Sequence, residues 1–359
     1  MKSILLTSTA LVAFAGAAAA DGHAAVSNAF SATIGYNDEN DGIGEDGFFW
    51  EGNLKTTATA ALDNGLTAGA YFEVTVGQEN GTANDDGGLD LVASDFVLSL
   101  ESETASLFFG DTGTAADKHW DSAGDMEQDG FTSGTDSAVL RGDATFGGVD
   151  ASISYIVDDA NQEVEQLSFG AGASFGAISL SAGYQEESDF VDSNGDYNGD
   201  EIFGVSAAGT FAGATVTVAY AENSTDGEDS TGIEVAYPFG PVTATAYYVD
   251  ESNGDANVGL TLAYASGPID VSLKVRDEQG RSEYNLEGSY DVGNGLTVLA
   301  GVLNENEEDV DYYIAADYDL GGGAMASFSY AEDDDGDQGD EIGAGEYDPG
   351  VTIKVTFEF

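Results

Sequence analysis

At four places in this chain, a phenylalanine beside a glycine turn is followed nine residues later by a tyrosine on the same outward face. The four pairs are Phe146 and Tyr155, Phe175 and Tyr184, Phe211 and Tyr220, and Phe239 and Tyr248. Nine residues of strand at about 3.3 Å each, tilted by roughly 40°, reach on the order of 23 Å. That height is close to the ~25 Å apolar band between the two aromatic girdles of an outer-membrane β-barrel. The repeat therefore predicts strands that cross a membrane.

Segments of about ten residues place apolar side chains at every second position, with small or polar side chains between them. One segment has Leu167, Phe169, Ala171, Ala173 and Phe175 on one face and Gln166, Ser168, Gly170, Gly172 and Ser174 on the other. A period of two residues is typical of a β-strand whose faces meet different surroundings. A secreted soluble β-protein would share this alternation, but it would not require aromatic residues at both ends of the apolar face.

Short glycine-rich turns alternate with long acidic segments. The turns are Asp63-Asn64-Gly65, Gly147-Gly148, Gly176, Ala212-Gly213, Gly240-Pro241, Gly267-Pro268, Gly293-Asn294-Gly295 and Gly321-Gly322-Gly323. The acidic segments are Asn37–Asp46, Asn80–Asp90, Asp111–Asp136, Glu186–Glu201, Glu222–Asp229, Asn304–Asp311 and Glu332–Asp348. Tight turns at one rim and long loops at the other are typical of an up-and-down barrel. We predict an all-β fold, a transmembrane antiparallel up-and-down β-barrel of roughly 16 to 20 strands that is wide enough to enclose water. Counting the segments between turns gives about 20 strands, and we expect an even number.

The N-terminus predicts export from the cytoplasm. Residues 1–20 carry Lys2, an apolar run from Ile4 to Phe14 and a small-residue end at Ala20, which is the pattern of a cleaved signal peptide. A later cut after Ala25 would change only a short stub. Residues 21–359 then form the barrel, and the absence of cysteine suits a chain that crosses an oxidising periplasm unfolded. We expect the outer membrane of a Gram-negative bacterium as its location.

The charge of the chain limits its partners. With 67 acidic against 8 basic residues the net charge is −59, so nucleic acid is excluded as a partner and anionic ligands are disfavoured. A disordered acidic chain does not fit a composition that is 42% hydrophobic. A solvated acidic surface, divalent-cation binding and a pore that attracts cations remain open and can coexist.

Three stretches support a family resemblance: Met1–Ala20 followed by Asp21, the run from Tyr318 to Ala324, and the terminal segment Val351–Phe359. Together with the Phe-Gly turns they resemble general porins of alphaproteobacteria such as Rhodobacter. Apolar residues alternate up to Phe357 and Phe359, similar to the signal that the outer-membrane barrel assembly machinery reads. The resemblance implies a 16-stranded homotrimer in outer-membrane lipid and lipopolysaccharide. It also implies a third external loop that folds into the barrel and narrows it.

Segment 111–137 lies where the family places this constriction loop, after a fifth strand. Its acids are Asp111, Asp117, Asp121, Asp125, Glu127, Asp129 and Asp136, against only Lys118 and His119 as bases. These acids could instead be simply solvated at the rim. Strand alternation places four bases on the pore wall, namely Lys55, Lys274, Arg276 and Lys354, because lipid exposure would cost each about 2 to 4 kcal/mol at the midplane.

A loop of carboxylates facing wall bases creates a transverse field, and family porins use this arrangement to orient polar solutes. Because carboxylates outnumber bases, we expect passive diffusion of small hydrophilic solutes and ions with cation selectivity. A structural pairing of Lys274 and Arg276 with Asp270 or Glu287 is an alternative role for these two bases. A non-conducting structural or adhesive barrel is an alternative function.

Other chemistry has little support in the sequence. Asp192–Asp196 and Asp333–Asp337 place oxygen donors at alternate positions, but both depart from the EF-hand pattern. We therefore expect no cofactor and no specific metal site, with weakly bound Ca²⁺ as the one possible addition. His23 and His119 are the only histidines, too few for a catalytic triad or a histidine metal site, so we expect no catalytic residues and no enzyme. A soluble acidic β-enzyme is the least favoured alternative.

Overall fold

A computed structural model of the chain describes residues 24–38, 47–77, 90–133, 137–157, 163–190, 197–305, 310–332 and 347–359. The first ten strands are β1 (Ala25–Asn37), β2 (Gly47–Ala61), β3 (Thr67–Gly77), β4 (Asp90–Glu101), β5 (Ala105–Gly110), β6 (Ala138–Phe146), β7 (Val149–Val157), β8 (Val164–Phe175), β9 (Ile178–Gln185) and β10 (Ile202–Phe211). The next ten are β11 (Ala214–Asn223), β12 (Glu228–Phe239), β13 (Val242–Glu251), β14 (Asn257–Ser266), β15 (Ile269–Glu278), β16 (Arg281–Gly293), β17 (Leu296–Glu305), β18 (Val310–Gly321), β19 (Ala324–Glu332) and β20 (Gly350–Glu358).

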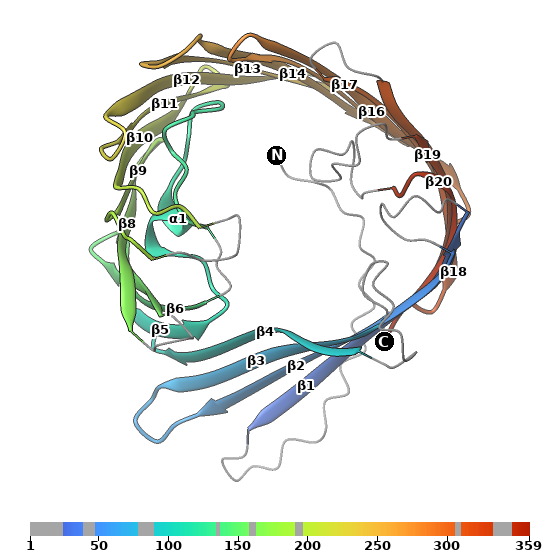
Figure 1. Ribbon diagram of the computed structural model, residues 1–359, viewed down its shortest axis with the longest axis horizontal. Coiled ribbons are helices and arrows are strands. Elements are labelled where there is room, and N and C mark those ends of the chain that lie inside the picture. The colour runs from blue at the N-terminus through green and yellow to red at the C-terminus, as the bar shows by residue number, and fades with distance from the viewer. Residues whose placement is uncertain are drawn as a thin grey trace.

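These 20 strands form one closed antiparallel sheet, the ring in Figure 1. Each strand pairs with the next in sequence, and β1 pairs with β20 from Ser31 opposite Glu358 to Asn37 opposite Thr352. Closure removes the unpaired edges that an open sheet would expose. The predicted all-β barrel with an even strand number is confirmed, at the upper end of the expected range. The strand number of 16 that the resemblance implies does not hold for this chain.

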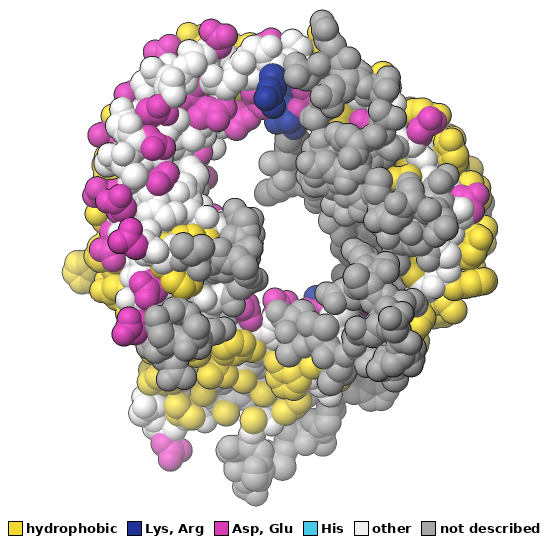
Figure 2. All heavy atoms as spheres, viewed as in Figure 1, with side chains coloured by type: hydrophobic (Ala, Val, Ile, Leu, Met, Phe, Trp, Pro, Cys, Tyr) yellow, Lys and Arg dark blue, Asp and Glu magenta, His cyan; other side chains and the backbone are white. Residues whose placement is uncertain are grey.

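Alternate side chains of each strand point away from the lumen. The outer face of the ring is apolar because the residues at these positions are mostly hydrophobic. The four phenylalanines of the repeat are all exposed, from 50% at Phe239 to 86% at Phe146. Tyr184 lies across the strand pair from Phe169, with ring centroids 6.4 Å apart. Hydrophobic side chains accordingly appear along the outer margin of the ring in Figure 2. The alternation read from the sequence is therefore the outward and inward alternation of the barrel.

The two rims of the barrel differ in their connections. Gly147 and Gly148 join β6 to β7 with φ of 62° and 84°, the left-handed conformation that tight two-residue hairpins need and glycine adopts without strain. All the predicted glycine turns separate consecutive strands. Two connections at the long-loop rim are short turns instead of long loops: residues 224–227 join β11 to β12, and Gln279 and Gly280 join β15 to β16. The Gln279 amide binds the Asp255 carbonyl at 2.7 Å, which ties this turn to its neighbour.

The single helix among the described residues, α1 (Ala115–His119), follows β5 and lies inside the ring in Figure 1. No helix in the described part of the chain is long and apolar enough to cross a membrane. Among the residues that the structure describes, no packed core fills the centre of the barrel. Instead, small buried clusters lie where segment 111–133 meets the wall, one of them formed by Ala123, Met126, Ala219, Ala221 and Val249.

Candidate functional site

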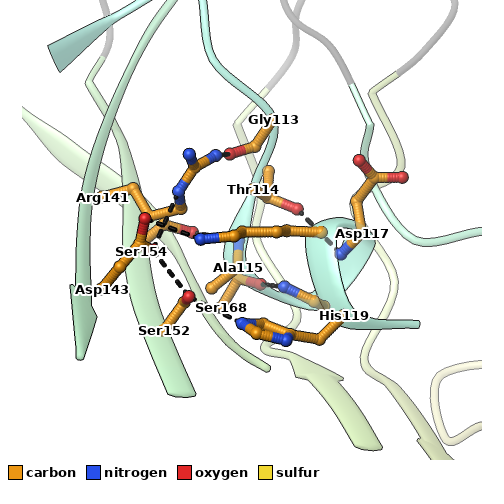
Figure 3. A network of polar contacts seen from close by, with 12 residues as sticks. Gly113, Thr114, Ala115, Asp117, His119, Arg141, Asp143, Ser152, Ser154 and Ser168 are labelled. Atoms are coloured by element: carbon orange, nitrogen blue, oxygen red, sulfur yellow. Dashed lines mark hydrogen bonds and ion pairs between the residues drawn. The ribbon is translucent and has the colours of Figure 1, made fainter. Parts of the chain in front are cut away.

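The start of α1 is held by the barrel wall. Backbone N–H groups in the first turn of a helix have no partner within the helix and must find one elsewhere. The Ala115 N–H donates to Ser154 Oγ and the Ala116 N–H to Ser168 Oγ, both at 2.8 Å (Figure 3). Thr114 caps the helix, and its hydroxyl donates to the Thr132 carbonyl at 2.6 Å. Two serines of the inner wall therefore satisfy backbone N–H groups in the first turn of α1.

Further polar side chains of the wall bind the rest of the segment. Four of them accept hydrogen bonds from backbone N–H groups of the loop. The Asp121 N–H donates to Ser181 Oγ at 3.2 Å, and the Gln128 N–H donates to Ser230 Oγ at 3.0 Å. The Glu127 N–H donates to Glu251 Oε1 at 3.1 Å, and the Thr132 N–H donates to Gln185 Oε1 at 2.8 Å. Asn257 Nδ2 also donates to the Asp125 carbonyl at 3.0 Å. Bonds of this kind occur from β7 to β14. Segment 111–133 is thus attached along an arc of the inner wall.

Glycines on the inner face allow the loop to approach so closely. A Cβ on Gly170 would lie 1.9 Å from the Ala115 carbonyl oxygen, and one on Gly232 would lie 2.2 Å from that of Ala123. A Cβ on Gly204 would lie 2.5 Å from the Trp120 ring. These distances exclude any side chain larger than hydrogen unless the loop moves. The small residues that the sequence places on the polar strand face are therefore the contact surface for the loop.

An aromatic contact closes the loop on itself. The Trp120 and Phe131 ring centroids lie 5.5 Å apart, and Trp120 Nε1 donates to Asp129 Oδ2 at 2.8 Å. Burial raises the pKa of Asp129 to about 6 despite this hydrogen bond, and the nearby carboxylates of Asp125 and Glu251 add to the effect. The loop therefore contains one acid that titrates close to neutral pH.

A network around Asp143 fixes the other end of α1 (Figure 3). The Asp143 carboxylate pairs with Lys118 Nζ at 2.7 Å and Arg141 Nε at 3.1 Å, and it accepts the Ser152 hydroxyl at 2.6 Å. His119 Nε2 lies 2.8 Å from Ser152 Oγ. Since the single Ser152 hydrogen points to Asp143, the histidine donates to Ser152 and does not remove its proton. The cluster therefore anchors the loop and lacks the proton relay of a hydrolase.

Arg141 is a site residue that our sequence reasoning missed. Its guanidinium lies 5.1 Å above the Phe108 ring and binds the Gly113 carbonyl, so it links β5, β6 and the loop. The parity of β6 carries the missing signal. Phe146 points outward, so Arg141, Asp143 and Thr145, at odd separations from it, point inward.

The predicted wall bases lie on the inner strand faces. Lys55 pairs with Glu73 at 3.1 Å. Lys274 and Lys354 alternate with Leu273 and Ile353, whose side chains belong to the outer face.

Arg276 has different partners from those that the sequence suggested. It pairs with Glu278 at 3.2 Å, with Glu283, and with Asp125 of the loop at 3.8 Å. Figure 2 shows a group of Lys and Arg side chains on the inner margin of the ring with Asp and Glu beside it. Arg276 thus brings a wall base and a loop acid together.

The predicted loop acids occupy different environments. Asp121, Asp125 and Glu127 are exposed, whereas Asp117 is partly buried, and desolvation raises its pKa. Asp111 accepts the Phe96 N–H. Asp136 lies outside the described residues.

The terminal aromatic residues lie at the closure of the ring. Phe359 exchanges two backbone hydrogen bonds with Phe30, of 2.7 and 3.1 Å, and its ring stacks on those of Phe30 and Phe357.

Several other predictions fall outside the described residues, namely the signal peptide, His23 and both candidate calcium segments. Among the residues that are described, no group of three or more His, Cys, Asp or Glu side chains is placed to hold a metal ion.

A closed antiparallel barrel with an apolar outer face and a loop bound to its inner wall defines a membrane-barrel protein of the channel-forming class. A family model described as Gram-negative porin matches residues 7–338. The chain therefore belongs to the Gram-negative porin family, and as a member of it is an outer-membrane porin channel.

The chain is also similar to solved porin structures. One mutant of Rhodopseudomonas blastica porin matches with a TM-score of 0.47 and 17% identity, covering 94% of this chain and 100% of that one. A second mutant of the same porin matches with a TM-score of 0.47 and 18% identity over the same shares. The curated proteins contain no match.

Proposed function

We propose that this protein is a cation-selective diffusion porin that admits small hydrophilic solutes and ions without turnover. The observation that carries the proposal is the state of the bases on the inner wall. Lys55, Arg141 and Arg276 of the wall and Lys118 of the loop each form ion pairs with carboxylates at distances between 2.7 and 3.2 Å. The charge of these four bases is locally compensated. Among the described residues Lys274 and Lys354 form no ion pair, but the chain has 67 acidic residues against 8 basic ones, so the acids determine the field in the lumen.

The charges of the exposed loop acids Asp121, Asp125 and Glu127 are less compensated. Among the described residues only Asp125 has a basic partner, Arg276 at 3.8 Å. Fixed negative charge in a confined aqueous space enriches cations and depletes anions. Segment 111–137 acts as the constriction loop in this proposal, with Lys55, Lys274, Arg276 and Lys354 on the facing wall. Its attachment from β7 to β14 supports a rigid constriction over a freely moving one.

The proposal extends to biogenesis and assembly on the strength of the sequence resemblance. A general porin of the alphaproteobacterial, Rhodobacter-like kind would be exported through the periplasm after removal of residues 1–20. The barrel assembly machinery would read the terminal strand ending in Phe359. The mature protein would be a homotrimer in outer-membrane lipid and lipopolysaccharide, without a cofactor, and calcium would bridge the acidic loops only weakly.

Reversal potential in a planar bilayer tests the proposal. With purified protein in a tenfold KCl gradient, we expect discrete conductance steps and a reversal potential displaced toward the K⁺ equilibrium potential. Anion selectivity would contradict the electrostatic argument. Absence of conductance from a folded, inserted barrel would instead favour the structural or adhesive alternative.

A further inference from the structure

A cavity of about 550 Å³ lies between the end of α1 and the inner wall. The loop side is formed by residues 118–121, and the wall side by β6, β7, β8 and β9 close to the tight-turn rim. The volume falls within the range of pockets that bind small molecules. It is therefore large enough to hold a solute beside the diffusion path.

Some polar groups of the cavity already have protein partners. Ser152 is bonded to Asp143 and His119, and Ser181 is bonded to the Asp121 N–H and to Ser206 at 2.8 Å. These groups shape the wall and have little remaining capacity to bind a solute.

Other polar groups of the cavity have capacity left. Within the described part of the chain, no protein hydrogen bond is made by the Asp121 carboxylate or by the Ser174 and Ser179 hydroxyls. Asp150 accepts one bond there, from Thr145 at 2.5 Å, which occupies one of its two oxygens. Two carboxylates and two hydroxyls thus face the same cavity with free acceptor capacity.

The cavity carries net negative charge. The ammonium of Lys118 is compensated by Asp143 at 2.7 Å, and Arg141 binds the same carboxylate. Burial and the neighbouring Lys118 lower the pKa of His119, so its ring is neutral at pH 7. The charges of Asp121 and Asp150 therefore remain without a cationic partner among the described residues.

We propose that this cavity is a binding subsite for small solutes that combine an ammonium group with several hydroxyls, as amino sugars do. The ammonium group binds the carboxylates of Asp121 and Asp150, and the hydroxyls bind Ser174 and Ser179. Charge-assisted hydrogen bonds are roughly twice as strong as neutral ones, so the ammonium group provides most of the selectivity. The inference rests on the proposed diffusion function and names the solute class that the channel retains longest.

Blocking of single-channel current by three probes tests the subsite. Glucosamine is largely protonated at pH 7 and has both features, N-acetylglucosamine keeps the hydroxyls without the charge, and ethylammonium keeps the charge without the hydroxyls. We expect glucosamine to reduce the current saturably, with a half-saturating concentration about tenfold lower than that of either other probe, the factor that about 1.4 kcal/mol represents. Equal effects of glucosamine and N-acetylglucosamine would overturn the proposal.

Variants locate the effect. Asp121→Asn should raise the half-saturating concentration of glucosamine about tenfold and leave that of N-acetylglucosamine within about twofold. The double substitution Ser174→Ala and Ser179→Ala should weaken both sugars and leave ethylammonium unaffected. Glu234→Gln is the matched control, because it removes an inner-wall carboxylate of β12 outside the cavity. Equal shifts in Asp121→Asn and Glu234→Gln would reduce the effect to general lumen charge and contradict the subsite.

Calorimetry separates this proposal from the proposed function. Titration of glucosamine into the folded barrel in detergent measures the heat of binding and does not depend on conductance. Saturable heat that Asp121→Asn abolishes supports the subsite even if the barrel does not conduct. Normal cation-selective conductance without any such heat overturns the subsite and leaves the diffusion function standing.

Discussion

Replacing Gly170 with alanine should release the loop from the wall. The added Cβ would lie 1.9 Å from the Ala115 carbonyl oxygen, whereas carbon–oxygen contacts need about 3.3 Å, so α1 must retreat by about 1.4 Å. That movement breaks the two 2.8 Å hydrogen bonds to Ser154 and Ser168. At about 0.5 to 1.5 kcal/mol each, their loss shifts the balance between attached and detached loop by about 5- to 150-fold. Gly170 does not occupy the left-handed region, so alanine adds no backbone strain.

Trp120 reports on this change directly. The chain has two tryptophans, and Trp50 lies on β2, so Trp50→Phe leaves Trp120 as the single fluorophore. In that background Gly170→Ala should shift the emission to longer wavelength and increase acrylamide quenching. Gly172→Ala is the matched control on the same strand, because its Cβ would meet His119 Nδ1 at an ordinary 3.5 Å. If both variants quench like the parent, close contact at Gly170 does not hold the loop.

Three further predictions concern charge, pH and assembly. Arg276→Gln should raise the cation-to-anion permeability ratio about fourfold in reversal-potential measurements. One charge about 10 Å from an ion contributes about 0.4 kcal/mol in water, and its removal favours the cation and disfavours the anion by that amount each. Arg281→Gln removes a charge exposed at the rim and should change the ratio less. The pKa of Asp129 rises from 3.8 to about 6, so the native state holds more protons than the unfolded state in that interval, and attachment of the loop weakens as pH rises through it. Asp129→Asn should remove that component of the pH dependence of tryptophan quenching, and an unchanged profile would exclude this acid as its source. Phe359→Ala should slow barrel assembly more than Phe146→Ala at the same rim does, because Phe359 stacks across the closing strand pair and Phe146 is 86% exposed. Heat-dependent gel mobility measures the rate of assembly in both variants.

Local patterns predicted most of the barrel. The alternation from Gln166 to Phe175 indicated which side chains face outward, and glycine turns such as Gly147-Gly148 indicated where hairpins reverse. Both signals are short in range, because strand parity and turn conformation depend on neighbouring residues. The number of strands followed from counting these units, and the family-implied number was wrong because it came from relatives instead of from this chain.

The loop contacts were beyond the reach of those patterns. Arg141 faces inward by parity, but nothing in its neighbours indicates that it binds the Gly113 carbonyl. The sequence offered Asp270 or Glu287 as alternative partners of Arg276, but Arg276 pairs with Glu278, Glu283 and Asp125. Asp125 is far from Arg276 in sequence, and only the path of the loop along the wall brings the two side chains together.

The amino-acid order of this chain is sufficient for an apolar exterior, a polar interior and two unequal rims, because each of these follows from interactions within a strand or one hairpin. Closure of β1 on β20, the seating of α1 against Gly170 and the cavity beside Asp121 depend on contacts between residues far apart in sequence. Those contacts exist only after the sheet has curved into a ring, since its radius and stagger fix which inner-wall groups a loop of given length can reach.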